Sequence, residues 1–265
     1  MQAACFAGLG ILLFASCSPA APPAVGNLSA SQKSAIGRKI WQNECAGSVD
    51  GLTTWNVGEE FPSLGIGHFI WYPAGFNGRF NETWPQFIAF AKQQGVTPPA
   101  VALEKHSPWN TKAEFQKDFN GPRLAALRKW LAGNVTLQTD FIIARSRGAV
   151  PKILAAAPAS ERAKIQANYQ KVAASPQGTY ALIDYVNFKG DGILATEKYK
   201  GQGWGLMQVL GGMKDVPAGA PAAAEFAASA KRILSRRIAN SPPERGEKRW
   251  ETGWHNRCDT YGRPL

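Results

Sequence analysis

Apolar residues recur at helical spacing through most of the chain and predict a largely helical protein. The clearest stripe runs from Pro122 to Gly133, where leucines and a tryptophan share one face between a first-turn proline and a final glycine. Such stripes indicate buried helix faces rather than functional surfaces. Helices are predicted over about 31–45, 83–94, 122–133, 135–156, 160–174, 180–188, 203–213 and 222–239.

Between Gly51 and Tyr72 the pattern changes to short apolar pieces separated by glycine and proline. Short runs of this kind predict a small β-hairpin or sheet. The predicted fold class is therefore α+β, predominantly α-helical. One domain over residues 31–265 accommodates the length, and nothing in the sequence forces a second one.

Glu44 is the candidate catalytic residue because its helical phase points it inward. It falls on the face of Ile36 and Ile40, whereas Lys33 and Lys39 lie on the solvated face. Burial beside apolar groups raises the pKa of a carboxyl and keeps it protonated near neutral pH. A general acid that donates to a glycosidic oxygen needs that proton. We therefore expect Glu44 to act as a general acid.

The charge of the chain is strongly positive. The formal net charge is +11, and no charged side chain precedes Lys33. Such a protein suits an anionic partner, for example peptidoglycan, a nucleic acid or a membrane surface, and solubility alone is the alternative explanation.

The first residues have the composition of an export signal. An apolar run over residues 6–15, too short to span a bilayer, ends in small residues before Cys17. This pattern is typical of a bacterial lipoprotein, with a signal peptide at 1–16, lipidation at Cys17 and a flexible tether at 17–30. A secretory signal cleaved near Ala21 is the alternative. Both predict export, and the first predicts a periplasmic protein that a lipid anchors to the outer membrane.

Cysteine and histidine give no sign of a metal site. The three histidines, His68, His106 and His255, are scattered and lack ligand spacing. In an oxidising compartment Cys45 and Cys258 could pair and tie the predicted catalytic helix to the C-terminal segment. Two unpaired, buried thiols are the alternative. We expect no metal and no cofactor.

The residues around Glu44 resemble the active-site region of a known superfamily. Glu44 ends a predicted helix, and a turn-rich stretch separates it from the segment Ser63-Leu64-Gly65-Ile66-Gly67-His68, predicted as a strand. Over roughly residues 36–72 this arrangement resembles phage-type lysozymes and endolysins of the lysozyme-like α+β superfamily. The resemblance implies a lysozyme-like fold with a small β-hairpin next to the catalytic helix. It also implies that Glu44 is the catalytic acid and that Ser63 takes the place of the active-site threonine, with an enlarged hairpin between them.

The family's second carboxylate, an aspartate, has no clean match in this chain. The candidates are Asp50, Glu59 and Glu60. Asp50 precedes a glycine and fits a turn better than a site. Glu60 is preferred to Glu59 because it lies nearest to the predicted strand. Such a carboxylate would work ionised, by activating water or stabilising the oxocarbenium-like transition state, and Ser63 would position the water.

Residues expected to bind the glycan flank this region. Aromatic planes stack on the C–H faces of sugars, so Trp71 is a candidate subsite wall. Trp55, Phe69 and Tyr72 are further candidates, and we expect only one or two of the four to face a cleft. Asn56 is a candidate for bonding to substrate amides or hydroxyls. His68 is expected to hold the hairpin or to bond to Glu44, and Gly65 and Gly67 fit either a cleft floor or a bulge.

A second set of candidates would face Glu44 from the opposite lobe, namely Asn187, Lys189, Gln202 and Gln208. The segment that ends at Gln208 resembles the Gly-Leu-Met-Gln of lytic transglycosylases. The Glu-Ser that carries catalysis in that family does not precede it here, so the segment is interpreted as helix packing.

These observations predict a lysozyme-like glycosidase that cleaves peptidoglycan and is a monomer. A chitosanase-like hydrolase or a lytic transglycosylase is the enzymatic alternative, although a cationic substrate suits a basic protein poorly. A non-catalytic envelope lipoprotein that only binds glycan is the alternative of another class. Cations and tryptophans alternate over 245–257, which suits a nucleic acid, a charged glycan or a segment folded back on the core. Export argues against a nucleic acid.

Overall fold

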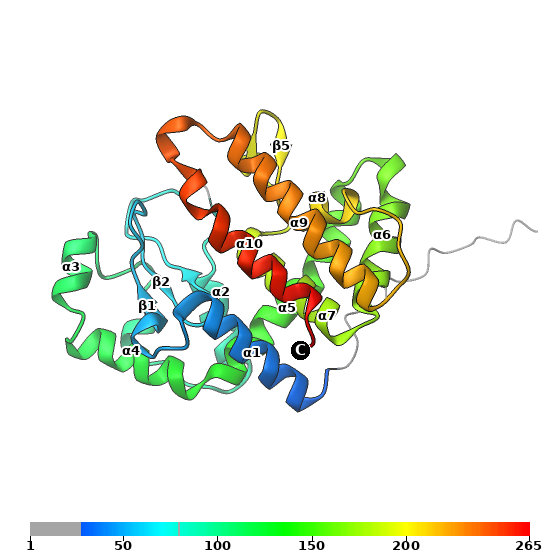
Figure 1. Ribbon diagram of the computed structural model, residues 1–265. Coiled ribbons are helices and arrows are strands. Elements are labelled where there is room, and N and C mark those ends of the chain that lie inside the picture. Colours follow the sequence, from blue (N-terminus) through cyan, green and yellow to red (C-terminus); the bar gives the residue numbers. More distant parts are fainter. Residues whose placement is uncertain (1–27, 79) are drawn as a thin grey trace, which may run out of the picture.

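The computed structural model describes residues 28–78 and 80–265, which are predominantly helical (Figure 1). The predicted signal peptide and Cys17 lie outside the described residues. The predicted class, α+β with helices dominating, is confirmed. The helices are α1 (Ala30–Cys45), α2 (Trp84–Gln93), α3 (Lys112–Lys117), α4 (Pro122–Gly133), α5 (Val135–Ala156), α6 (Ala159–Ala173), α7 (Pro176–Lys189), α8 (Leu206–Gly211), α9 (Ala220–Asn240) and α10 (Glu251–Asp259).

Local sequence signals explain where several helices begin and end. The Ser29 hydroxyl accepts from the N–H of Gln32, and the Gln32 side chain accepts from the N–H of Ser29, which forms a capping box at the start of α1. Helix α4 begins at Pro122, whose missing N–H costs nothing in a first turn, and it buries its leucine stripe. The bounds predicted for α4 and α5 are confirmed.

A small antiparallel sheet follows α1. Its strands are β1 (Thr53–Thr54), β2 (Ser63–Leu64) and β3 (Phe69–Ile70), with β2 in the centre. Ser63 lies opposite Thr54 on one side and Ile70 on the other. Residues 65–68 form the turn between β2 and β3, so the prediction that Gly65 to His68 continue a strand is wrong. A second, two-stranded ribbon consists of β4 (Lys198–Tyr199) and β5 (Gln202–Gly203).

The arrangement places helices from the two ends of the chain at the centre. The three-stranded sheet, α3 and α4 lie on one side, α6, α8 and α9 lie on the other, and α1, α5, α7 and α10 lie between them (Figure 1). Helix α5 packs on α1 and α7, and α10 packs on α9. One hydrophobic cluster extends through these elements from Ile36 to Tyr261.

Candidate functional site

Glu44 lies next to the last residue of α1, where the helix meets the sheet. Ala46 leaves the helix with φ +50°, and its N–H bonds to the carbonyl of Trp41. The thiol of Cys45 donates to the carbonyl of Gly65 in the β2–β3 turn at 3.6 Å. The Glu44 side chain is 13% exposed. The inward direction predicted from helical phase is therefore confirmed.

The β2–β3 turn brings His68 to Glu44. Gly65 has φ +73°, and a Cβ there would lie 2.4 Å from Oε1 of the buried Gln138, which accepts from the N–H of Ile66. Packing on this glutamine explains the glycine. His68 has φ +46°, which is uncommon for a residue with a side chain, and its Nδ1 lies 3.5 Å from Oε2 of Glu44. The turn therefore holds the imidazole beside the carboxylate in a left-handed conformation.

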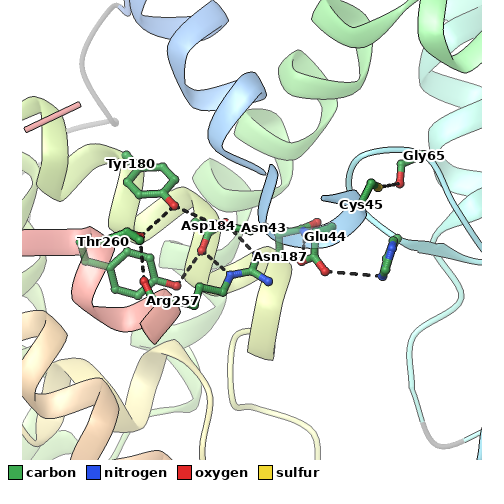
Figure 2. Close-up of polar contacts among 11 residues, drawn as sticks. Asn43, Glu44, Cys45, Gly65, Tyr180, Asp184, Asn187, Arg257 and Thr260 are labelled. Atoms are coloured by element: carbon green, nitrogen blue, oxygen red, sulfur yellow. Dashed lines mark hydrogen bonds and ion pairs between the residues drawn. The ribbon is translucent and has the colours of Figure 1, made fainter. Parts of the chain in front are cut away.

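Arg257 of α10 binds the other side of Glu44 (Figure 2). Its Nη2 lies 2.7 Å from Oε1 of Glu44. Its Nε and Nη2 also donate to the two carboxylate oxygens of Asp184 in α7, each at 2.8 Å. Asp184 is fully buried and accepts from the Tyr261 hydroxyl at 2.6 Å. One guanidinium, with its planar set of donors, thus joins α1, α7 and α10 at a single point.

The charge of Glu44 differs from the sequence prediction. Burial raises its pKa, but the charges of Arg257 and His68 and the hydrogen bond from Arg257 outweigh burial and hold the pKa below its ordinary value. Glu44 is therefore ionised at neutral pH in the free protein. The expectation that it is protonated there is wrong, because helical phase carries no information about a partner on the last helix.

Glu59 lies near enough to Glu44 and His68 for their charges to affect its pKa. Burial raises the pKa of Glu59, the hydrogen bond from Asn56 and the charge of His68 lower it, and the charge of Glu44 raises it, so that the pKa lies above its ordinary value. Glu60 is exposed. Glu59 is thus the more buried of the two, which favours it, and the preference for Glu60 as the second carboxylate stays a prediction.

The loop after β1 holds Glu59 in place. Asn56 donates from Nδ2 to Oε2 of Glu59 at 3.0 Å, and the indole N–H of Trp55 donates to the Glu59 carbonyl at 2.7 Å. Asn56 is exposed, so this candidate binding residue lies beside the second carboxyl. Asp50 is also exposed and lies 3.7 Å from Arg128, in a short 3₁₀ helix (Asp50–Leu52) away from these contacts.

The aromatic candidates belong to the core. Trp71 is fully buried and stacks on Trp84, with ring centroids 5.3 Å apart. Trp55, Phe69 and Tyr72 are buried as well, so none of the four offers an open ring face to a sugar. The prediction that Trp71 is a subsite wall is therefore wrong. Apolar spacing alone does not distinguish a cleft aromatic from a core aromatic.

Ser63 is buried in the central strand of the sheet. The residue is 3% exposed, and the polar contacts of Glu44 among the described residues do not include it. Its place beside Thr54 in the strand register is that of a sheet residue. A role in positioning water stays a prediction that rests on the resemblance.

Two of the four candidates from the opposite lobe reach the site. Asn187 donates from Nδ2 to Oε1 of Glu44 at 3.4 Å, and the charge of Lys189 lowers the pKa of Glu44. The Gln208 amide instead bonds to the backbone at both of its polar atoms. Its Oε1 accepts from the N–H of Gly205, and its Nε2 donates to the carbonyl of Gly192, which fixes the loop around 190–192. Gln202 is exposed and bonds to the end of α9. The placement of Gln208 argues for packing and against contact with substrate.

Two buried polar atoms beside Glu44 have no hydrogen-bond partner within the described part of the chain. They are Nε2 of His68 and Oδ1 of Asn187. Buried polar atoms are nearly always bonded, so these two are unsatisfied hydrogen-bonding capacity beside an ionised carboxylate, whereas the other unpaired buried groups of the described residues, the indole N–H of Trp71, Trp84 and Trp130, lie in the aromatic core. Sequence reasoning missed Arg257 at this site. The only signal for it was its place in the segment 245–257, where cations and tryptophans alternate.

The remaining sequence predictions concern thiols, metals and membranes. Within residues 28–78 and 80–265, Cys45 and Cys258 are free thiols, and burial raises the pKa of each to about 12. The same residues contain no group of three side chains able to hold a metal ion. None of the described helices has the length and apolar character needed to cross a bilayer.

The chain matches no protein-family model, no curated protein and no solved structure. Its chemistry is therefore interpreted from the geometry around Glu44 and from the resemblance of residues 36–72.

Proposed function

We propose that the protein is a glycoside hydrolase that cleaves the glycan strands of bacterial peptidoglycan. The observation that carries the proposal is the ionised Glu44 between Arg257 and His68, with two unpaired polar atoms beside it. The charge of His68 also affects a second carboxyl, Glu59, whose pKa shifts in the opposite direction from that of Glu44. Most glycosidases use two such carboxyls, one protonated and one ionised. The resemblance of the α1 end and the Ser63–His68 segment to phage-type lysozymes supports the same reaction on a lysozyme-like fold.

The pKa order supports a division of roles. Glu59, whose carboxyl stays protonated to higher pH, donates to the leaving glycosidic oxygen. Glu44, which Arg257 keeps ionised, stabilises the oxocarbenium-like transition state or activates water. This assignment reverses the role that the resemblance implies for Glu44. The unpaired atoms of His68 and Asn187 then hold the sugar or the attacking water.

The positive net charge of the chain and its expected export favour peptidoglycan over a neutral glycan as the substrate. The net charge of +11 attracts a polymer that carries free carboxylates on its peptides. The proposal includes export as a lipoprotein anchored to the outer membrane through Cys17. Replacement of Cys17 by alanine should abolish fatty-acid labelling and membrane fractionation, and labelling that survives the change would contradict the anchor.

A zymogram on purified sacculi tests the reaction. Glu44→Gln and Glu59→Gln should each reduce clearing by roughly 10²- to 10⁴-fold, the contribution typical of an acid–base group. Glu104→Gln is the matched control, because Glu104 is exposed and lies in another loop. Glu60→Gln should retain activity, and its loss would support the preference drawn from the sequence. Clearing that survives Glu44→Gln in a folded protein would overturn the proposal.

The pH profile tests the roles. If Glu59 donates the proton, kcat/KM should fall as pH rises through the raised pKa of Glu59 and should persist at acidic pH until Glu44 is protonated. If Glu44 were instead the proton donor, the fall of kcat/KM with rising pH would follow the lowered pKa of Glu44, below about 4.5. A fall of kcat/KM in that acidic range would contradict the role of Glu59 as proton donor.

A second candidate function is glycan binding without cleavage. The contacts of Glu44 with Arg257, His68 and Asn187 favour this function. Together they restrain the carboxylate in the way that partners restrain the acid of a structural ion pair. A protein of this type would sediment with sacculi and release no sugar. Binding without clearing in the unaltered chain would select this function.

A further inference from the structure

Beside the Glu44 site, cations and aromatic rings alternate along one face of α10. Trp250, Trp254 and Arg257 follow one another at helical spacing, and the two indoles stack with centroids 5.7 Å apart at 29°. Lys189, at the end of α7, places Nζ 3.6 Å from the Trp254 ring centroid and 3.9 Å from that of Phe188. The guanidinium of Arg257 lies 4.1 Å from Phe188. The row therefore continues directly into the contact between Arg257 and Glu44.

Positive charge is in excess at this surface. Among the described residues, no carboxylate forms an ion pair with Lys189 or with Arg249, whose guanidinium lies 4.5 Å from the Trp250 ring, whereas Arg237, Arg245 and Arg257 have carboxylate partners. The groups concerned are the cations Lys189, Arg237, Arg245 and Arg257 and the carboxylates Glu44, Asp184 and Glu247. The unmatched charges belong to Lys189 and Arg249, and of the two Lys189 is the one held between aromatic rings beside the Glu44 site.

The environment of Lys189 is unfavourable for an isolated cation. Burial, followed by the charges of Arg237 and Arg257, lowers its pKa well below the ordinary value, and the charges of Glu44 and Glu247 offset only part of this. A bound anion would supply the missing counter-charge. Lys189, Trp250 and Trp254 are each half-buried residues, so part of each lies at the surface.

We propose that Lys189, Phe188, Trp254 and Trp250 form a subsite for a sugar residue that carries a carboxylate, next to Glu44. The ammonium binds the carboxylate, and the half-buried indoles contact the C–H face of the sugar ring. A single cation held between rings suits one carboxylate better than the repeated phosphates of a nucleic acid. The subsite rests on the proposed function only in that it aligns the glycan for cleavage at Glu44.

Binding to two forms of the same polymer tests the subsite. Sacculi with free carboxylates are compared with sacculi whose carboxylates have been amidated, by cosedimentation of the full chain on ice within minutes. Amidation should weaken binding of the unaltered protein by roughly tenfold, as expected for one charged hydrogen bond. In Lys189→Met the remaining net charge still favours free carboxylates, so amidation should weaken binding, but clearly less than in the unaltered protein. Lys189→Arg should keep the discrimination, because it keeps the charge.

The matched control is Lys152→Met. Lys152 is exposed on α5, and its replacement changes the net charge by the same amount. This variant should respond to amidation as the unaltered protein does. If amidation weakens Lys189→Met as strongly as the unaltered protein, the subsite assignment is wrong.

A measurement on the unaltered chain makes the test independent of how variants fold. Acetic anhydride labelling, read by mass spectrometry, should show Lys189 protected by native sacculi and not by amidated sacculi. Lys152 should be labelled equally in both. Equal labelling of Lys189 in the two samples would overturn the proposal, as would displacement of the protein by single-stranded DNA that depends on Lys189. Binding that discriminates carboxylates without any clearing would leave the subsite standing and remove the hydrolase.

Discussion

Two ion-pair clusters of this protein look alike in composition and differ in completeness. At Glu247, which is fully buried, the carboxylate accepts from Arg237 at 2.8 and 2.9 Å, from the Tyr199 hydroxyl at 2.8 Å and from Arg245 at 3.1 Å. At Glu44, one contact is short and the contacts to Asn187 and His68 are 3.4 and 3.5 Å. Groups of the chain satisfy the hydrogen-bonding capacity of the Glu247 cluster, whereas the Glu44 cluster keeps unpaired polar atoms.

The difference distinguishes a structural ion pair from a candidate site. Every oxygen of Glu247 has donors, and the hydrogen bonds of Arg237 hold α9 to the segment before α10. The Glu44 cluster leaves two neighbouring polar atoms unpaired, and the Glu44 side chain is not fully buried. Burial and charge are therefore poor guides by themselves, and unsatisfied hydrogen-bonding capacity is what sets the Glu44 cluster apart.

The largest expected effect on stability comes from removing the carboxylate of the Glu247 cluster. Glu247→Gln leaves two arginines without a full counter-charge and should lower the free energy of unfolding by about 3–5 kcal/mol. Glu44→Gln should cost only about 1–3 kcal/mol, because Arg257 keeps Asp184 as its partner. Urea unfolding measures both. Equal losses would erase the distinction between the clusters.

An acid titration of stability should show the same contrast. The hydrogen bonds and charge of Arg237 lower the pKa of Glu247 to about 2, against the effect of burial, from an ordinary value of 4.5. A carboxyl with a lowered folded-state pKa stabilises the fold above its unfolded-state pKa. That stabilisation should be lost as pH falls from about 4.5 to about 2. Melting temperature against pH should show a steep decline in this window, and Glu247→Gln should flatten it.

Effects smaller than that of Glu247→Gln are expected from removing one hydroxyl from each cluster. Tyr199→Phe and Tyr261→Phe each remove a hydrogen bond to a buried carboxylate and should lower the free energy of unfolding by about 1–3 kcal/mol. Only Tyr261→Phe loosens the Asp184–Arg257 contact, so it alone should reduce clearing of sacculi. A loss of clearing in Tyr199→Phe of equal size would mean that the two clusters act together.

The sequence predicted the fold where local signals agree. Pro122, the leucine stripe and Gly133 bound α4, and a long apolar periodicity gives α5. Helix α10 was not predicted, because it contains Gly253 and lacks an apolar stripe, and its position depends on contacts with α9. The same limit applies to the site. Helical phase oriented Glu44, but only tertiary structure reveals Arg257 as its partner.

The choice between neighbouring residues also required tertiary structure. Glu59 and Glu60 have the same chemistry, and the Asn56–Glu59 loop decides which one turns inward. Trp71 has the character expected of either a core or a cleft residue, and its stack on Trp84 places it in the core. Composition identifies such residues as candidates, and the three-dimensional contacts select among them.

The contact between Arg257 and Glu44 has a kinetic consequence. It joins the first and the last α-helix of the described chain. Asn187, which also contacts Glu44, lies 143 positions after Glu44 in the sequence. Contacts between such distant positions carry a large loop-closure cost and tend to form after local helices. Losing an interaction that is absent from the folding transition state accelerates unfolding and leaves the folding rate nearly unchanged. The half-life of the native state, more than the speed with which it forms, should therefore depend on this one guanidinium.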